Sequence, residues 1–287
     1  MNIAPSAASG WLVPSRVSAL SADDLTALER AAQELERTSL AMRLTSLLGR
    51  QVGVIGSIIP PHVSEIANKA AEAAIKSALA LALRSLDGRP ARDSRRLHKS
   101  AAVLAGAAGG AFGFSALAVE LPFTTTVMLR SIAAIAKSEG EDLSHPQAAL
   151  ACLEVFALGG RPYAGPLARG AADAGLETGY FAVRAILAKS VSEAAHYLVE
   201  RGLAEEAAPV LVRFVTQIGA RFGIVVSQKL AAQSIPVVGG VCGAAINYAF
   251  VDHFQTLARG HFTILRLERR YGAGLVRSEY EQFLKRA

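Results

Sequence analysis

Two long stretches of this sequence lack Asp, Glu, Lys and Arg, and they limit the possible folds more than any other feature. Residues 101–119 (AAVLAGAAGGAFGFSALAV) and residues 230–251 (LAAQSIPVVGGVCGAAINYAFV) contain 19 and 22 positions. Helices of these lengths are long enough to cross the hydrocarbon core of a bilayer. Exposed to water, either stretch would form a large apolar patch, so each must be covered by protein or by lipid.

Glycines are regularly placed within both stretches. Each has a Gly-Gly pair near its middle, and four-residue spacing puts glycines on one helix face, where another backbone can approach closely. Three structures remain open: buried helices of a large bundle, helical hairpins broken at the Gly-Gly pairs and inserted into the membrane, and helices that span it. The predicted membrane or lipid contacts are Gly106, Gly109, Gly110, Gly113, Gly239, Gly240 and Gly243.

The rest of the chain also predicts helices. No segment alternates apolar and polar residues over the length of a half-buried strand. Ser21 and Asp24 form a capping signature that opens an amphipathic helix. We therefore predict an all-α fold, a single multi-helix bundle with two Gly-rich apolar helical hairpins, over residues 21–287, after an irregular segment at 1–20. Further helices are expected at about 63–86, 122–137, 146–158, 173–201, 205–233 and 243–271.

The charged residues are few and unevenly distributed. Hydrophobic residues make up 52% and charged residues 19% of the chain, against roughly 25% charged in an ordinary soluble domain. The net charge is +6, and basic clusters follow Arg84 and Arg259, beside the two apolar stretches. Anionic lipids attract such residues by about 1 kcal/mol each, although a solvated face explains them equally well. The predicted headgroup contacts are Arg92, Arg95, Arg96, Lys99, Arg266, Arg269 and Arg270.

The sequence lacks the motifs that several classes of function require. The basic runs have no interleaved aromatic residues and no recognisable binding motif, so we expect no nucleic-acid partner. There is no nucleophile elbow, P-loop, His-Glu-x-x-His or dinucleotide-binding glycine motif. The sequence therefore favours a protein without enzymatic activity and predicts no cofactor and no metal.

Location is indicated by the cysteines and the N-terminus. Cys152 and Cys242 lie in apolar helical contexts, which is typical of reduced, buried thiols. The first residues do not form a basic segment followed by an apolar core, so we expect no signal peptide. We predict a cytoplasmic protein that is peripheral to, or partly inserted in, the inner membrane.

Polar residues within apolar surroundings form the remaining feature. The favoured interpretation is a buried hydrogen-bonded network, because a charge removed from water needs a partner. The alternative is a soluble enzyme or ligand-binding protein with a polar pocket around Asp252, His253 and His261. No second His or Cys follows either histidine at the spacing of a helical metal site. The network residues are Glu120, Arg130, Lys229, Asn247, Asp252, His253 and His261.

Three runs of the sequence resemble the EcsC family over roughly residues 40–272. They are HKSAAVLAGAAGGAFGFSALAVELPFTTTVMLRSIAAIAKSEGED at 98–142, CLEVFALGG at 152–160 and IPVVGGVCGAAINYAFVDHFQTLARGHFTILRLERRYG at 235–272. The family is named for a gene beside a bacterial ABC exporter. The resemblance implies a helical, membrane-associated accessory protein, with an ABC transporter or other membrane protein as partner. It implies no catalytic residues. The apolar stretches and their basic flanks themselves predict membrane lipid or an acyl chain as ligand.

Overall fold

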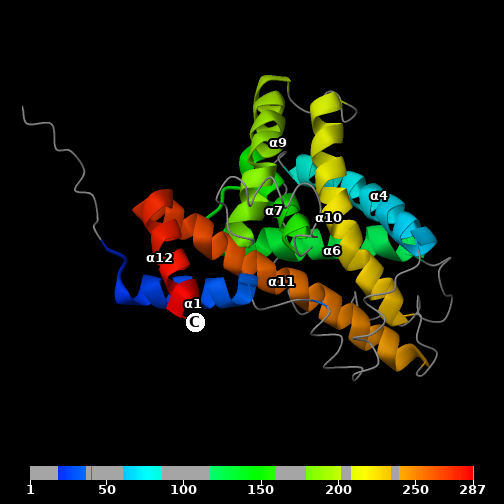
Figure 1. The fold of residues 1–287 in the computed structure, drawn as a ribbon. Coiled ribbons are helices and arrows are strands. Elements are labelled where there is room, and N and C mark those ends of the chain that lie inside the picture. Colours follow the sequence, from blue (N-terminus) through cyan, green and yellow to red (C-terminus); the bar gives the residue numbers. More distant parts are fainter. Residues whose placement is uncertain are drawn as a thin grey trace, which may run out of the picture.

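The computed structural model describes residues 19–36, 40, 61–85, 117–159, 179–201, 208–233 and 239–286. In this part of the chain all regular structure is helical, which confirms the all-α prediction (Figure 1). Most of the predicted irregular segment at 1–20 lies outside the described residues. The helices are α1 (Ala22–Glu36), α4 (Pro61–Ser85), α6 (Leu117–Ser138), α7 (Pro146–Leu158), α9 (Tyr180–Arg201), α10 (Pro209–Gln233), α11 (Gly239–Tyr271) and α12 (Ala273–Arg286).

The local signals for two helix starts are confirmed. At α1 the Asp24 backbone N–H donates to Ser21 Oγ at 3.2 Å, and the Ser21 hydroxyl donates to the Asp24 carboxylate at 3.0 Å. These bonds satisfy groups that the first turn of a helix leaves without a partner. Helix α7 has Pro146 in its first turn, where the missing N–H costs nothing. It has the predicted bounds.

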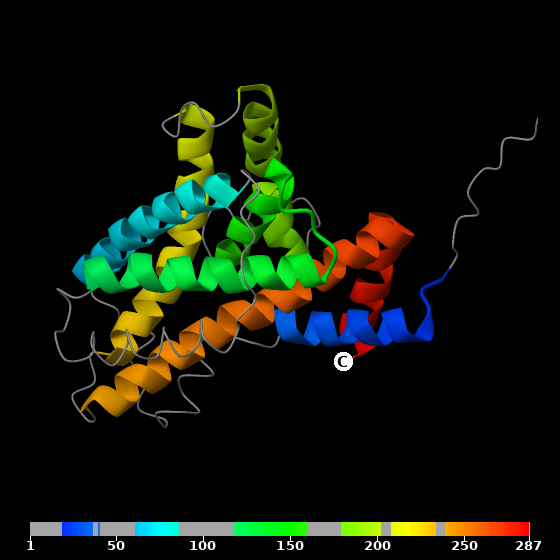
Figure 2. The same ribbon diagram turned by 180° about the vertical axis from the view of Figure 1, so that it is seen from behind.

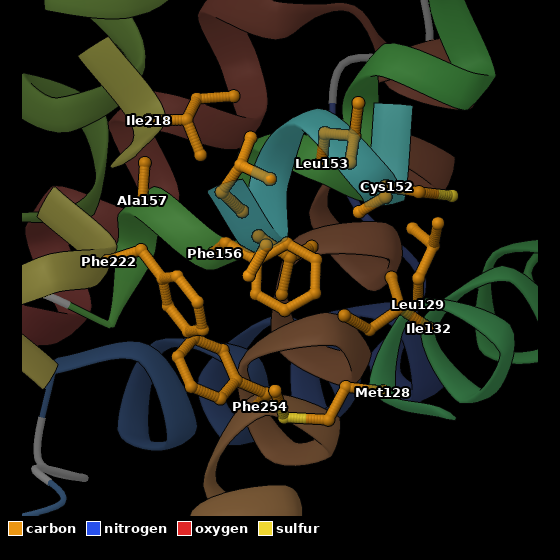
Figure 3. Close-up of a cluster of buried hydrophobic side chains, with 14 of the residues drawn as sticks. Met128, Leu129, Ile132, Cys152, Leu153, Phe156, Ala157, Ile218, Phe222 and Phe254 are labelled. Atoms are coloured by element: carbon orange, nitrogen blue, oxygen red, sulfur yellow. The ribbon is translucent and has the colours of Figure 1, made fainter. Parts of the chain in front are cut away.

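The main hydrophobic core is built around α7. Residues 148–157 of α7 are all buried, which explains why this helix is apolar on every side. Phe156 of α7 packs against Phe222 of α10 and Phe254 of α11, with ring centroids 5.1 and 5.4 Å away. Figure 3 shows these rings between Met128 and Ile218. Helices α4, α6 and α9 complete this core.

A smaller core joins α1 and α12 to the C-terminal part of α11. Gly260 allows the close approach of α1, because a Cβ there would lie 2.7 Å from Leu35 Cγ and 3.2 Å from the Ala31 carbonyl oxygen. Gly272, with φ of +88°, ends α11 in the left-handed conformation that glycine adopts at little cost. The chain then turns back into α12.

Helices α4 and α10 pack antiparallel through small residues. A Cβ on Gly219 would lie 3.2 Å from Glu72 Cα, and one on Gly223 would lie 3.2 Å from Asn68 Cα. The backbones therefore touch at these two glycines, which were not among the predicted helix contacts. Helix α4 also carries a series of buried alanines: Ala67, Ala71, Ala74, Ala78 and Ala82.

The second apolar stretch contains the end of one helix and the start of another. Of the structures left open for residues 230–251, a single spanning helix is not observed, because α10 ends at Gln233 and α11 begins at Gly239. The Gly239-Gly240 pair forms the first turn of α11 and does not break a helix there. The first apolar stretch lies outside the described residues, except for its last three, which begin α6.

One helix in the described residues is long and apolar enough to cross a membrane. It is Pro209–Leu230 of α10, and 56% of its most apolar window is buried inside the protein. Core helices of soluble proteins have the same length and composition. The finding is therefore weak evidence for a membrane span.

We expect Gly219→Leu to lower the free energy of unfolding by about 1–3 kcal/mol, because the new side chain must displace the α4 backbone. Urea unfolding followed by circular dichroism measures this change. Ala220→Leu is the matched control, because Ala220 is the next residue of α10 and is exposed. Equal effects of the two substitutions would contradict the close packing.

Candidate functional site

Four helices meet at one end of the bundle, where α4, α6 and α11 begin and α10 ends (Figures 1 and 2). We call this the convergent end. The antiparallel register of α4 and α10 brings the start of the first beside the end of the second. Both apolar stretches adjoin this end in the sequence, since residues 101–116 directly precede α6 and residues 234–238 lie between α10 and α11.

A buried ion pair joins three of these helices. Lys229 Nζ of α10 donates to Glu120 Oε1 of α6 at 2.6 Å, and the two side chains are 0% and 6% exposed. The ammonium also lies 4.9 Å from the centre of the Phe250 ring of α11, within reach of a cation–π interaction. Burial lowers the pKa of Lys229, while Glu120 opposes this shift. The pair fixes α6, α10 and α11 against one another.

Further polar side chains are buried next to this pair along the same helices. Asn247 is fully buried one turn before Phe250 on α11, and Thr124 is fully buried one turn after Glu120 on α6. The interior of the convergent end is therefore more polar than the phenylalanine core. Three predicted network residues, Glu120, Lys229 and Asn247, lie here.

The surface of the convergent end carries large apolar side chains. Ile66 of α4 is 46% exposed, Phe123 of α6 is 49% exposed and Tyr248 of α11 is 46% exposed. Ile66 and Phe123 lie in the second turn of their helices, and Tyr248 lies in the third turn of α11. Three different helices thus present an apolar or aromatic group at the same end of the molecule.

A second polar cluster lies at the other end of α11, where it packs against α9. The Tyr180 hydroxyl and His261 Nδ1 are 2.9 Å apart. The Arg184 guanidinium donates to both carboxylate oxygens of Glu268, at 2.8 and 3.0 Å. Glu154 of α7 is buried within electrostatic range of Arg184 and Glu268. Of these residues, only His261 is among the predicted network residues.

Burial acts in opposite directions on two groups of this cluster. It raises the pKa of Glu154 to about 7, although Arg184 opposes the shift and Glu268 adds to it. It lowers the pKa of His261 to about 3, and Arg184 adds to that shift. In mildly acidic solution the folded protein therefore holds an uncharged carboxyl and an uncharged imidazole here.

The predicted polar residues do not form one network or one pocket. Arg130 lies on the exposed face of α6, so its assignment to a buried network is wrong. Asp252 is half-buried, and His253 is buried beside Gly159. His253 and His261 are separated by about 12 Å along α11, at 1.5 Å per residue. Because α11 is a continuous helix, these residues contact different neighbours. Among the described residues no group of His, Cys, Asp and Glu is suited to a metal ion.

The predicted headgroup arginines of α11 have acidic partners. Arg266 binds Asp24 at 3.1 Å and Glu139 at 2.8 Å. Arg270 binds Asp24 at 2.9 Å, and Arg269 pairs with Glu141. These ion pairs attach α1 and the turn after α6 to α11. All three arginines keep part of their side chains exposed, and a headgroup role for them stays a prediction.

The other predicted contact residues are placed as follows. Gly243 is buried within α11, while Gly239 and Gly240 form its first turn. The remaining predicted glycines and basic residues lie outside the described residues; they are Gly106, Gly109, Gly110, Gly113, Arg92, Arg95, Arg96 and Lys99.

Comparison with known proteins identifies one family. The model of the EcsC protein family matches residues 22–267, from the start of α1 to near the end of α11. No curated protein and no solved structure matches the sequence. The matched region includes the convergent end and, apart from Glu268, the residues of the second polar cluster.

We expect Glu120→Leu or Lys229→Met alone to lower the free energy of unfolding by about 3–5 kcal/mol, because each leaves a buried charge without its partner. The double variant should lose less than either single variant. A double-mutant cycle measured by urea unfolding tests this coupling. The same cycle on the exposed pair Glu65 and Lys69 should show little or no coupling. Additive losses at Glu120 and Lys229 would contradict the pairing.

The Glu154 and His261 shifts predict a specific pH dependence. The raised pKa of Glu154 makes stability fall as pH rises from 4.5 to about 7. The lowered pKa of His261 makes stability fall as pH drops from 6.5 towards about 3. Each slope is about 1.4 kcal/mol per pH unit, so they cancel between pH 4.5 and 6.5.

Removing one group should reveal the slope of the other. Relative to the unmodified protein, Glu154→Gln should make stability rise with pH by about 1.4 kcal/mol per unit in this window. His261→Asn should change the slope by the same amount in the opposite direction. Urea unfolding at a series of pH values measures both, and unchanged slopes would show that these groups titrate normally.

Proposed function

This chain belongs to the EcsC protein family, and we propose that it is a membrane-associated accessory protein that binds a lipid bilayer through the convergent end. The observation that carries the proposal is the exposure of Ile66, Phe123 and Tyr248 at that end. Burying a large apolar side chain completely is worth about 1.5–3 kcal/mol. Covering three half-exposed groups would therefore contribute several kcal/mol to association with an apolar phase.

The chemistry of these side chains suits the boundary between headgroups and acyl chains. Tyrosine has an apolar ring and a polar hydroxyl, and it is enriched at membrane–water interfaces. Ile66 and Phe123 are purely apolar and would lie deeper. A lipid surface would cover all three side chains at once.

The positions of the two apolar stretches also favour the convergent end as the membrane-binding surface. Helix α6 begins at Leu117 and α11 begins at Gly239, so lipid insertion of residues 101–116 or 234–238 would start from the convergent end. The buried pair of Glu120 and Lys229 would hold α6 and α10 in place beneath it. Exposed apolar groups and uncharged segments would thus act at one surface.

In this proposal the protein catalyses no reaction. It would bring its helical bundle to the cytoplasmic face of the inner membrane and bind lipid or an acyl chain there. A transporter such as an ABC exporter is the proposed protein partner, which follows from the family's association with an exporter gene. The polar cluster around Glu154 and His261 would contribute to the stability of the fold and would not take part in a reaction.

Vesicle flotation with the purified full-length chain tests this function. We expect a triple variant, with serine at 66, 123 and 248, to bind phosphatidylcholine–phosphatidylglycerol vesicles about a hundredfold more weakly. This estimate assigns about 1 kcal/mol to each half-exposed side chain. The matched control places serine at Leu25, Val199 and Val212, which are 36%, 71% and 40% exposed elsewhere in the structure.

The control variant should bind vesicles as the unmodified protein does, and circular dichroism should show that both variants stay folded. An unmodified protein that remains entirely in the soluble fraction would contradict the proposed function. So would an equal loss of binding in both triple variants, because that result would deny any special role to the convergent end.

A further inference from the structure

Helix α6 carries an exposed stripe of one aromatic and two basic residues. Phe123, Arg130 and Lys137 follow one another at seven-residue spacing, and all three are exposed. Seven residues are close to two turns of an α-helix, so these side chains share one face. From Phe123 to Lys137 the stripe extends about 21 Å at 1.5 Å per residue.

The stripe has no opposing negative charge among the described residues. The only acidic residue of α6 is Glu120, which is buried against Lys229. No carboxylate in the described part of the chain lies within ion-pair distance of Arg130 or Lys137. The neighbouring helix α4 differs, because its exposed lysines Lys69 and Lys76 contact Glu65 and Glu72 at 2.7 and 3.0 Å.

The partly exposed side chains between the members of this stripe are short. Thr126, Ala133 and Ala134 are the partly exposed residues on this side of α6. Their short side chains would let the longer Arg and Lys side chains extend along the helix and reach a flat surface. Figure 2 shows α6 lying across the bundle between α4 and α11, with its start at the convergent end.

We propose that α6 lies along the surface of an anionic bilayer, with Phe123 inserted just below the headgroups and with Arg130 and Lys137 on headgroup phosphates. The inference rests on the proposed function and adds an orientation to it. Charge complementarity favours this occupant, since each basic residue near an anionic membrane contributes about 1 kcal/mol. The aromatic anchor at one end of the stripe continues into the apolar surface of the convergent end.

The test compares two variants with the same change in net charge. Arg130→Gln with Lys137→Gln should bind phosphatidylglycerol-containing vesicles about 30-fold more weakly, which corresponds to two contributions of about 1 kcal/mol. Lys69→Gln with Lys76→Gln should weaken binding by no more than about threefold, because those lysines are already paired. Pure phosphatidylcholine vesicles should not distinguish either variant from the unmodified chain.

A fluorescence measurement tests the position of Phe123 separately. Phe123→Trp in a Trp11→Phe background should be quenched by brominated lipid in the bilayer. Val212→Trp in the same background is the control, and it should remain unquenched because Val212 lies at the start of α10, outside the convergent end.

The outcomes separate this inference from the function on which it rests. An unmodified protein that binds no vesicles would remove both proposals. Vesicle binding that is lost with serine at 66, 123 and 248, but is unaffected by the Arg130 and Lys137 substitutions, would overturn only the placement of α6. Equal losses in the two charge variants would also overturn it, since net charge alone would then explain binding.

Discussion

Both hydrophobic clusters are built against one helix, α11, so burial of its apolar residues is the interaction on which the rest of the structure depends. Phe250 and Phe254 belong to the main core, while Ile264 and Leu267 belong to the smaller one. Between them, Gly260 lets α1 approach the backbone. Helices α1 and α12 also contact α9, where the Tyr180 backbone N–H donates to Glu36 at 2.9 Å and Phe181 packs against Tyr280.

Because the interior is apolar, the polar residues buried in the bundle must either pair with one another or remain uncharged. An ion pair such as Glu120 and Lys229 costs several kcal/mol in desolvation, and apolar replacements of similar volume are often as stable. The ion pair has a definite effect on geometry, because it connects α6 to α10 and places the Lys229 ammonium over the Phe250 ring of α11. At the other end, burial favours the uncharged forms of Glu154 and His261, which avoids the cost of burying charge in mildly acidic solution.

Burial also changes the interpretation of the second apolar stretch. Its described residues are largely covered by the protein's own helices; Leu230, Ile246 and Phe250 are buried. Tyr248 is the exception, at 46% exposed. The proposed lipid contact from this stretch is therefore a tyrosine, because the buried Gly243 is unavailable to lipid. Together with Ile66 and the α6 stripe, Tyr248 defines a surface that a bilayer would cover.

The sequence by itself determined the features that depend on neighbouring residues. The capping bonds between Ser21 and Asp24, the bounds of α7 and the absence of strands in the described residues follow from spacings of a few positions. The family resemblance was likewise carried by contiguous runs. These features were predictable because helix formation is governed by contacts within about four residues.

Only the tertiary structure decided which distant residues meet. Lys229 binds Glu120, which is 109 positions away in the sequence, and Arg266 binds Asp24, which is 242 positions away. Helical periodicity gives the face on which a residue lies but does not specify the helix that will cover that face. For this reason Arg130 was assigned to the interior and proved exposed, and Gly219, rather than a predicted glycine, forms the tight contact with α4.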